Sequence, residues 1–449
     1  MATSGGGVLS VAETSFWSAG SLAERAQGRW LGDVPGEPVV GVSIDTRTMR
    51  PGEAYVAIAG ENHDGHAYVN AAIEAGAAFA VIDDAQCAEK LNDLNRVLLV
   101  PDAVAALQAW ASAYRDLLAE AGCRVIAIAG SNGKTTTRHL LHHVLTRCGM
   151  TGTQSPKSFN NHLGVPLTLL AARPEHDFVA CEIGTNHPGE VDALARIARP
   201  DAATITCIGQ EHLEFFGDIN GVAREEAALL PHVRPGGVVF VEADAAERIA
   251  PYYDVQENVA MLPVHAIRYS DHIPEDFPLP GEHHRRNASL VVATTRWLIG
   301  SDAGIREALQ DAGGVEGRMQ TLRYAEGVTV IHDAYNANPD STRLALQHLD
   351  NLDVPRASKA ALLGDMLELG SHAQTAHAEA CRQARRVVGP DRLWCVGELF
   401  EGAEPWSDAL AERVVGSLKP GDVLLLKGSR GLRLERILPH LESRFGPPT

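Results

Sequence analysis

The fold is decided by residues 122–145, which read GCRVIAIAGSNGKTTTRHLLHHVL. The mostly apolar run Arg124–Ala129 is typical of a buried strand, and it leads into a turn that contains two glycines. A helical pattern follows, with apolar residues at positions 140, 141, 144 and 145. Strand, glycine turn and helix in this order begin a βαβ unit, so the segment predicts an α/β fold.

The turn in this segment has the composition of a phosphate-binding loop. Glycine allows backbone N–H groups to approach phosphate oxygens, and the N-terminus of the following helix adds a favourable dipole. Lys134 would neutralise phosphate charge, and the Thr135 hydroxyl would bind Mg²⁺. A chance turn is the alternative, because Ile128 stands where the full P-loop motif has its first glycine. The flanking strand and helix favour the nucleotide site, whose predicted contacts are Gly130, Ser131, Asn132, Gly133, Lys134, Thr135 and Thr136.

Apolar runs on either side of this loop predict three α/β units. Central runs alternate with helical stretches, which is typical of a mostly parallel sheet with helices on both faces. The pattern changes near residue 122, and Gly313-Gly314 marks a second boundary near 315, so the predicted domains are 1–120, 121–315 and 316–449. Residues 251–281 carry five prolines and predict loop or irregular strand. The predicted strands beyond Arg124–Ala129 are Ala54–Ala59, Phe79–Asp83, Val97–Val100, Phe178–Cys181, Ala203–Ile208, Val238–Val241, Val328–Ile331, Ala360–Leu363, Leu393–Val396 and Val423–Leu426.

Polar residues follow several of these strands. Open α/β sheets bind ligands outside the carboxyl ends of their strands, so two such sheets facing one another would enclose a cleft lined by these residues. Taken alone, Glu182 fits a solvated acid at a strand end, and His212 fits an ordinary loop histidine. Because both follow strands beside a phosphate loop, they are predicted to bind a metal. Mg²⁺ needs few protein ligands, because phosphate and water complete its shell. Three further polar segments are candidate ligand-binding residues, although each also fits an ordinary turn or helix cap. They are Asn160-Asn161, residues 333–341 with Asp333 and Asn336, and the turn Lys427 to Arg430 with Ser429.

Composition restricts the class of protein. Hydrophobic residues make up 45% and charged residues 21% of the 449 residues, which is typical of a globular protein. The net charge of −18 argues against a general affinity for nucleic acid or an anionic membrane. The seven cysteines lack zinc-ligand spacing, no apolar run approaches about 18 residues, and the first cation is Arg25. The sequence therefore predicts a soluble, cytoplasmic protein with reduced thiols.

Together these segments resemble the Mur ligase family, over about residues 40 to 435. The glycine loop is shared with folylpolyglutamate synthases, whereas YNANPDS with GDMLELG resembles the D-Ala-D-Ala-adding branch of the family. The matching strings are Asp45-Thr46-Arg47, Asp64-Gly65-His66, GSNGKTTT, NNHLGVPLTLL, EIGTNHPGE, HLEFFG, DAYNANPDS, LLGDMLELG and KGSRGLRLE.

The resemblance implies a UDP-sugar-binding domain, a central ATP-binding domain and a Rossmann-like domain for the incoming amine. It implies an ATP- and Mg²⁺-dependent monomer that activates UDP-N-acetylmuramoyl-tripeptide as an acyl phosphate and joins it to D-Ala-D-Ala in peptidoglycan precursor synthesis. The third residue of the peptide, lysine or diaminopimelate, is left open. By family position, the uridine nucleotide is held by Thr46 and Arg47, the sugar or peptide by Asn160 and Asn161, magnesium by Thr135, Glu182 and His212, adenosine by Asn287, Arg318, Asp333 and Asn336, and substrate also by Lys427 and Ser429.

Two positions depart from the family pattern. Mur ligases usually carry, fourteen residues after the HLE histidine, a lysine that is carbamylated to form a metal-binding carboxylate. Glu226 occupies that position, and no lysine occurs between Lys157 and Lys359, so we expect Glu226 to supply the carboxylate directly. The family's HN before the helix asparagine reads His283-His284, although Asn287 is retained.

Two rival functions follow. A related amide ligase could act on another carboxylate, such as a folate-like precursor, and binding of the UDP-muramoyl peptide would discriminate against it. The missing lysine also motivates a catalytically idle, nucleotide-binding homologue. Retention of Lys134, Thr135, Glu182 and His212 argues against the idle homologue.

Overall fold

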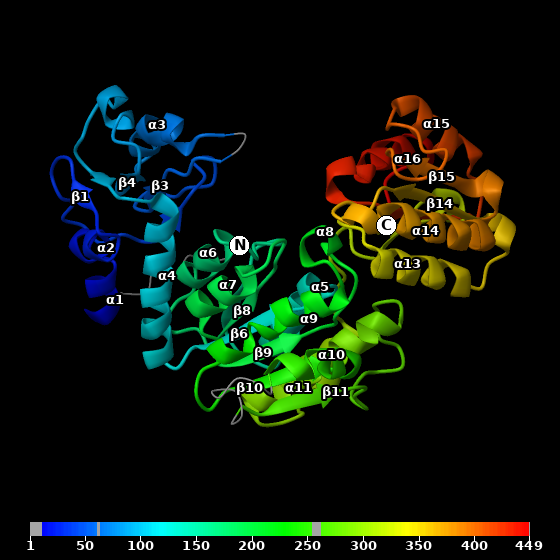
Figure 1. Cartoon of the computed structure of the whole chain (residues 1–449), viewed down its shortest axis with the longest axis horizontal. Coiled ribbons are helices and arrows are strands. Elements are labelled where there is room, and N and C mark those ends of the chain that lie inside the picture. Colours follow the sequence, from blue (N-terminus) through cyan, green and yellow to red (C-terminus); the bar gives the residue numbers. More distant parts are fainter. Residues whose placement is uncertain (1–10, 61–62, 254–261, 449) are drawn as a thin grey trace.

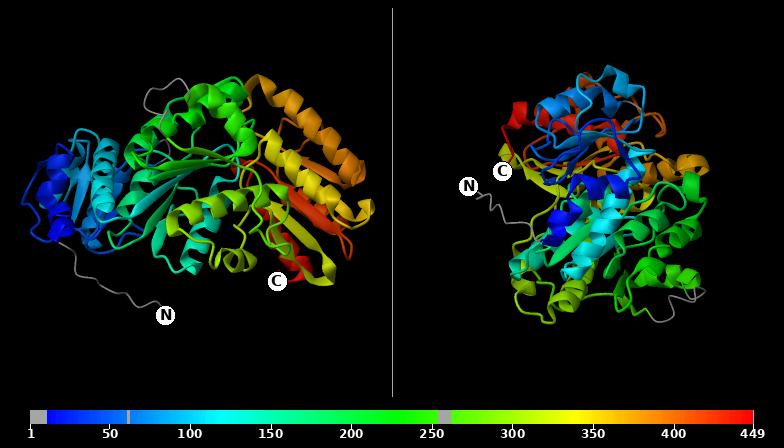
Figure 2. Two further views of the ribbon diagram at one scale, coloured as in Figure 1. Left: turned by 90° about the horizontal axis from the view of Figure 1, so that it is seen from below. Right: turned by 90° about the vertical axis from the view of Figure 1, so that its left-hand side faces the viewer.

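The computed structural model describes residues 11–60, 63–253 and 262–448, which form three β-sheets arranged in a row (Figure 1). The left view of Figure 2 shows the same row, with the first and last sheets at opposite ends of the central one. The α/β fold with three units that the sequence predicts is therefore confirmed. Among the described residues, no helix is both long and apolar enough to cross a membrane.

The first sheet has the strand order β1-β5-β4-β3-β2, with β1 antiparallel to β5 and the other pairs parallel. The apolar runs that predicted strands here form β3, β4 and β5, but each strand is shorter than its predicted range. The elements are α1 (Val11–Phe16), α2 (Ala19–Arg25), β1 (Arg29–Trp30), β2 (Val42–Ser43), β3 (Ala54–Val56), α3 (Val69–Glu74), β4 (Phe79–Ile82), β5 (Val97–Leu99) and α4 (Ala103–Glu120).

The central sheet has six parallel strands in the order β11-β10-β9-β6-β8-β7. Strand β6 (Arg124–Ala129) is covered on both faces. Val125 and Ala127 face one apolar core, and Ile126 and Ile128 face the other, which contains apolar residues of α5 and α11. The remaining elements are α5 (Lys134–Arg147), β7 (Gly152–Gln154), α6 (Gly164–Leu170), β8 (Phe178–Glu182), α7 (Glu190–Ala198), β9 (Ala202–Ile205), α8 (Leu213–Phe216), α9 (Ile219–Ala227), β10 (Val238–Glu242), α10 (Ala243–Tyr253), β11 (Val264–Ile267), α11 (Glu282–Ile299) and α12 (Ile305–Gln310).

The last sheet has the order β12-β13-β16-β14-β15, with only β12 antiparallel to its neighbour. Helix α13 begins at an Asn338 capping box, in which the Asn338 and Ser341 side chains each accept the other's backbone N–H. The elements are β12 (Gln320–Arg323), β13 (Thr329–Asp333), α13 (Pro339–Asn351), β14 (Lys359–Gly364), α14 (Ala373–Val388), β15 (Leu393–Val396), α15 (Asp408–Ser417), β16 (Val423–Lys427) and α16 (Leu438–Phe445).

Two sequence predictions need correction. The predicted strand Ala203–Ile208 ends at Ile205, because the chain then turns alongside the phosphate loop, where Thr206 bonds to Ala129 O and Asn132 O. The proline-rich segment 251–281 contains an edge strand, β11, that pairs in parallel with β10; residues 254–261 of this segment lie outside the described residues.

A buried ion pair connects helix α4 of the first unit to the central unit. Arg115 of α4 is 0% exposed, and its Nη2 lies 2.6 Å from Oδ2 of Asp201, which precedes β9. Asp201 Oδ2 also accepts the Val125 N–H at 2.9 Å, and Oδ1 lies 3.3 Å from Nη1 of Arg124. Helix α4 therefore contacts the amino-terminal ends of the central strands β6 and β9 through a charged network.

Candidate active site

The glycine turn joins β6 to α5, as the sequence predicts. Gly130 has φ +109° and Gly133 has φ +86°, which is the left-handed region that glycine tolerates. A Cβ on Gly130 would lie 2.5 Å from Thr206 Oγ1, and one on Gly133 would lie 2.6 Å from Asn287 Nδ2. Both positions thus require glycine, and Asn287 of α11 lies directly against the loop.

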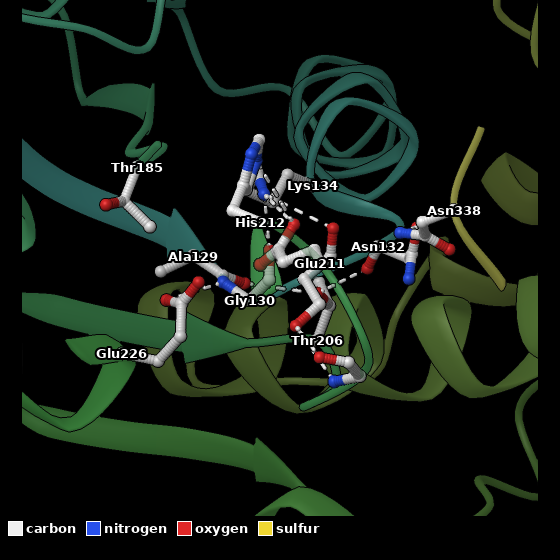
Figure 3. A network of polar contacts seen from close by, with 12 residues as sticks. Ala129, Gly130, Asn132, Lys134, Thr185, Thr206, Glu211, His212, Glu226 and Asn338 are labelled. Carbon is white, nitrogen blue, oxygen red and sulfur yellow. Dashed lines mark hydrogen bonds and ion pairs between the residues drawn. The ribbon is translucent and has the colours of Figure 1, made fainter. Parts of the chain in front are cut away.

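Lys134 begins α5, and its side chain, which is 13% exposed, lies among carboxylates. Its Nζ donates to Gly130 O at 2.6 Å and lies 3.8 Å from Glu211 Oε2 (Figure 3). Burial acts to lower the pKa of Lys134, but the carboxylates of Glu211, Glu226 and Glu182 outweigh it and raise the pKa. The ammonium is therefore charged and close to the loop, which suits the binding of phosphate.

Glu182 ends β8 beside the first turn of α5. Its Oε1 accepts from Thr135 Oγ1 at 3.1 Å and from Asn160 Nδ2 at 3.0 Å. Its Oε2 lies 3.4 Å from Nε of Arg138, a residue that is 5% exposed. Thr135, Asn160 and Glu182 are thus brought together. By contrast, Asn161 Oδ1 accepts the N–H groups of Leu163 and Gly164, as the ordinary-turn interpretation predicts.

Glu226, on α9, reaches the same loop from another side (Figure 3). It is 0% exposed, and its Oε2 accepts the Gly130 N–H at 2.9 Å. Burial raises the pKa of Glu226 to about 8, and nearby Lys134 acts in the opposite sense. Among the described residues, no group hydrogen-bonds to Glu226 Oε1.

The last unit contacts the phosphate loop directly. Asn338 Nδ2 donates to Asn132 Oδ1 at 2.9 Å. Asp340 Oδ2 accepts the Gln210 N–H at 2.9 Å, and it would lie 2.8 Å from a Cβ on Gly209. The strand ends of the two sheets therefore face one another, as the sequence predicts.

His212 connects the central unit to the last one. It adopts φ +47° before α8, and its Nδ1 lies 2.5 Å from Oε2 of Glu368, which follows β14. This contact lowers the pKa of the Glu368 carboxyl. Glu368 O also accepts the Glu214 N–H.

The predicted adenosine residues of the last unit form one cluster. Asp333 Oδ2 pairs with Lys427 Nζ at 2.9 Å, and Lys427 also donates to Asn336 O at 2.7 Å. The Arg318 guanidinium lies 4.3 Å from the ring centre of Tyr335. Lys427 is therefore used within the last unit, where it holds the Asp333 to Asn336 segment.

A cavity of about 170 Å³ lies between the central and last units. Its walls contain the predicted residues His212, Asn336 and Ser429. They also contain Arg430, from the same predicted turn as Ser429, and Glu211 and Glu368, which were not predicted as site residues. Thr46 and Arg47 lie elsewhere, in the turn after β2, where Arg47 pairs with Asp45 at 2.7 Å.

The donor set fits a magnesium ion held largely by phosphate and water. Within the described residues, no three His, Cys, Asp or Glu side chains gather to hold a metal, so Glu182, His212 and Glu226 do not form one protein cage. However, Thr135 Oγ1 and Glu182 Oε1 are neighbouring oxygen donors of the kind that Mg²⁺ prefers. The buried Glu226 Oε1 is a further unpartnered oxygen at the loop.

Several functional candidates had little sequence signal. Arg138 is one turn into α5 and contacts Glu182, Gln154 and Lys157 O, yet nothing in its local pattern predicts this. Glu211 immediately precedes the matching string HLEFFG, and Glu368 lies within LLGDMLELG, so membership of these strings is the sequence signal for both.

Three family models match the chain in order. They are the Mur ligase family, catalytic domain, at residues 38–115; the Mur ligase middle domain, at 128–295; and the Mur ligase, glutamate ligase domain, at 317–430.

Relatives and solved structures agree with these matches. The UDP-N-acetylmuramoyl-tripeptide–D-alanyl-D-alanine ligase of Bacillus subtilis (strain 168) is 32% identical, over 94% of this chain and 97% of that protein. The ligase of the same name from Escherichia coli (strain K12) is 28% identical, over 89% and 93%. A crystal structure of MurF from Acinetobacter baumannii superposes with a TM-score of 0.79 at 26% identity, covering 95% of this chain and 99% of that one. With relatives this similar along almost their whole length, the chain belongs to the Mur ligase family, in the branch of UDP-N-acetylmuramoyl-tripeptide–D-alanyl-D-alanine ligases.

Proposed function

We propose that this chain is an ATP-dependent ligase that joins D-alanyl-D-alanine to UDP-N-acetylmuramoyl-tripeptide in peptidoglycan precursor synthesis. The relatives named above carry this activity in their names. The observation that carries the proposal is the position of Lys134. Its Nζ lies 3.8 Å from Glu211 Oε2 beside the glycine loop, and the last unit contacts that loop through Asn338. A phosphate-transfer site and a second substrate domain thus meet at one place.

The reaction proceeds in two steps, formation of an acyl phosphate and formation of the amide. A carboxylate oxygen of the tripeptide attacks the terminal phosphorus of ATP, the bond to ADP breaks, and an acyl phosphate forms. The dipeptide amine then attacks the acyl carbon, the carbon–oxygen bond to phosphate breaks, the amine loses one proton, and an amide and free phosphate remain. The first step brings anions together, and the buried Lys134 ammonium offsets their repulsion. Enclosure between the two units limits attack by water.

We assign the nucleotide and substrate contacts as follows. Backbone N–H groups of the loop hold phosphate, and Asn287 of α11 lies against the same loop. Lys427 positions the adenosine segment rather than contacting substrate, since its ammonium is held by Asp333 and Asn336 O. The complete proposed set is Gly130, Ser131, Asn132, Gly133, Lys134, Thr135, Thr136, Asn287, Arg318, Asp333 and Asn336 for ATP, and Thr46, Arg47, Asn160, Asn161 and Ser429 for the substrates.

Magnesium would be held by Thr135, Glu182 and His212, with Glu226 supplying a carboxylate near the loop. When bound, the ion supplies positive charge that stabilises phosphate transfer. The unpartnered, buried Oε1 of Glu226 supports its role. The family's carbamylated lysine offers a specific test of this role: Glu226→Gln should lose activity, and Glu226→Lys should regain it when bicarbonate is added. Full activity of Glu226→Gln would exclude a metal role.

Product mass after incubation with ATP, Mg²⁺, UDP-N-acetylmuramoyl-tripeptide and D-Ala-D-Ala tests the function. We expect the amide product with one phosphate released per turnover. Hydroxylamine should trap the acyl phosphate when the dipeptide is omitted. Release of phosphate without an amide product, or trapping only with a different acid, would favour the rival functions. We also propose a cytoplasmic location, in agreement with all seven cysteines being free thiols.

A further inference from the structure

Arg138 is a buried arginine on the helix that follows the phosphate loop. It lies one turn after Lys134 and is 5% exposed. Its Nε lies 3.4 Å from Glu182 Oε2, its Nη2 donates to Lys157 O at 2.9 Å, and its Nη1 donates to Gln154 Oε1. A guanidinium is costly to bury unless its charge is paired and its N–H groups are bonded, and these contacts meet both needs. One side chain therefore connects α5 to the ends of β7 and β8 and to residue 157.

Residues 155–161, which follow β7, form a turn that contacts Glu182 at both of its ends. The Oγ of its first residue accepts the Glu182 N–H at 3.0 Å, and Asn160 Nδ2 donates to Glu182 Oε1 at 3.0 Å. Between these contacts, Lys157 has φ +51°, in the left-handed region that is unfavourable for a residue with a Cβ. The Arg138 guanidinium bonds to the carbonyl of Lys157, so it stabilises the turn where its backbone is strained.

Asn160 has little freedom within this turn. Its O accepts the Gly184 N–H at 2.8 Å, and a Cβ on Gly184 would lie 2.5 Å from Asn160 Nδ2. An amide has two N–H donors and an acceptor oxygen, so the bond to Glu182 leaves the side chain able to bind a ligand as well. Misplacement by about 1 Å is enough to weaken such a contact strongly. The contact that Asn160 can offer a ligand therefore depends on how firmly residues 155–161 are held.

We propose that Arg138 is a positioning residue for the UDP-tripeptide. It holds residues 155–161 in place, so that Asn160 meets UDP-N-acetylmuramoyl-tripeptide beside the phosphate loop. The inference rests on the proposed function and deepens it. The shape of the guanidinium carries this role, because a planar fork with five N–H donors reaches three acceptors at once. A lysine ammonium is a compact charge that could stay beside Glu182, but it could not also reach the other two acceptors.

Arg138→Lys tests this role, with Arg147→Lys on the exposed last turn of the same helix as the matched control. We expect Arg138→Lys to raise KM for UDP-N-acetylmuramoyl-tripeptide by about tenfold, the effect of one lost charge-assisted hydrogen bond. KM for ATP should stay within about twofold, because the charge beside Glu182 is kept. Titration calorimetry with ADP present should show the same loss of affinity for the tripeptide. A tripeptide KM equal to that of Arg147→Lys overturns the inference, and so does a parallel rise in both KM values, which a general loosening of the fold would cause.

Gln154→Leu gives a second test, in which Arg138 itself is kept. The Gln154 amide oxygen orients the guanidinium, so this change should raise KM for the tripeptide by about threefold. In the double variant with Arg138→Lys this contact is already absent, and we expect the KM of Arg138→Lys alone. An unchanged tripeptide KM in Gln154→Leu, or two single effects that multiply in the double variant, would overturn the inference. Absence of any amide product from the unmodified enzyme, by contrast, overturns the proposed function itself.

Discussion

Asp201→Asn is predicted to weaken the attachment of α4 to the central sheet. The introduced amide oxygen can still accept the Val125 N–H, so the change chiefly removes the negative charge 2.6 Å from Arg115. Burial lowers the pKa of Arg115, and the Asp201 charge opposes this effect. A buried cation without its counter-charge typically costs about 3–5 kcal/mol of unfolding free energy, and we expect a loss of this size.

Arg115→Met should be less damaging, because Asp201 keeps the Val125 N–H and the partly exposed Arg124. We expect a loss of about 1–3 kcal/mol from this single change. The double variant should be more stable than Asp201→Asn alone, since no buried charge then remains unpaired.

Urea unfolding followed by tryptophan fluorescence measures these differences, because Trp110 of α4 is fully buried and donates to Leu22 O. Asp116→Asn, on an exposed part of α4, is the matched control and should change stability by less than about 0.5 kcal/mol. The reasoning fails if the double variant loses the sum of the two single losses, or if Asp201→Asn unfolds at the same urea concentration as Asp116→Asn.

Three further changes test the loop and a buried histidine. Lys134→Met should lower the rate of phosphate transfer at least about a hundredfold, as hydroxylamine trapping would show, while Lys90→Met in the first unit should leave the rate unchanged. Gly130→Ala should destabilise the protein and weaken ATP binding more than Gly122→Ala does. Both glycines have a positive φ, but only at position 130 would the added Cβ collide with Thr206. Equal melting temperatures and equal ATP affinities of the two variants would contradict this. Burial lowers the pKa of His284 to about 4, so this residue binds more protons in the unfolded state between pH 4 and 6.5. Stability therefore falls as pH falls through this window, and His284 alone contributes about 3 kcal/mol to the loss. Thermal unfolding of His284→Phe should show a smaller loss over that window, whereas His162→Gln, on the surface, should follow the unmodified protein.

Local pattern was enough to predict the core of the fold. Successive residues of β6 face two different apolar cores. Because both faces of the strand are buried, nearly every position is apolar, and the sequence shows a continuous apolar run. The turn at Gly130 and Gly133 was also predictable, because its glycines and the following Lys134 act through backbone geometry within a few residues. The strands β1 and β2, with two residues each, were missed because they are too short to show alternation.

Contacts between units could not be predicted from local pattern. Glu211 lies 3.8 Å from Lys134 Nζ and lines the same cavity as Arg430, which is more than two hundred residues away in the sequence. The same holds for Asp340, which could be recognised as part of a helix start but not as a partner of the Gln210 N–H. Asn161 shows the converse case, since its turn contacts are local and the ordinary interpretation was available from sequence.

The hydrogen bond from Asn338 Nδ2 to Asn132 Oδ1 joins the last unit to the nucleotide loop, and Asn338 is not one of the proposed ligand contacts. A small molecule wedged between these two side chains would hold the last domain away from the nucleotide loop without resembling ATP or a muramoyl peptide. Because Asn132 is also a proposed ATP contact, such a molecule would compete with ATP, and its contact with Asn338 would make it selective against ATP-using enzymes that lack this pair.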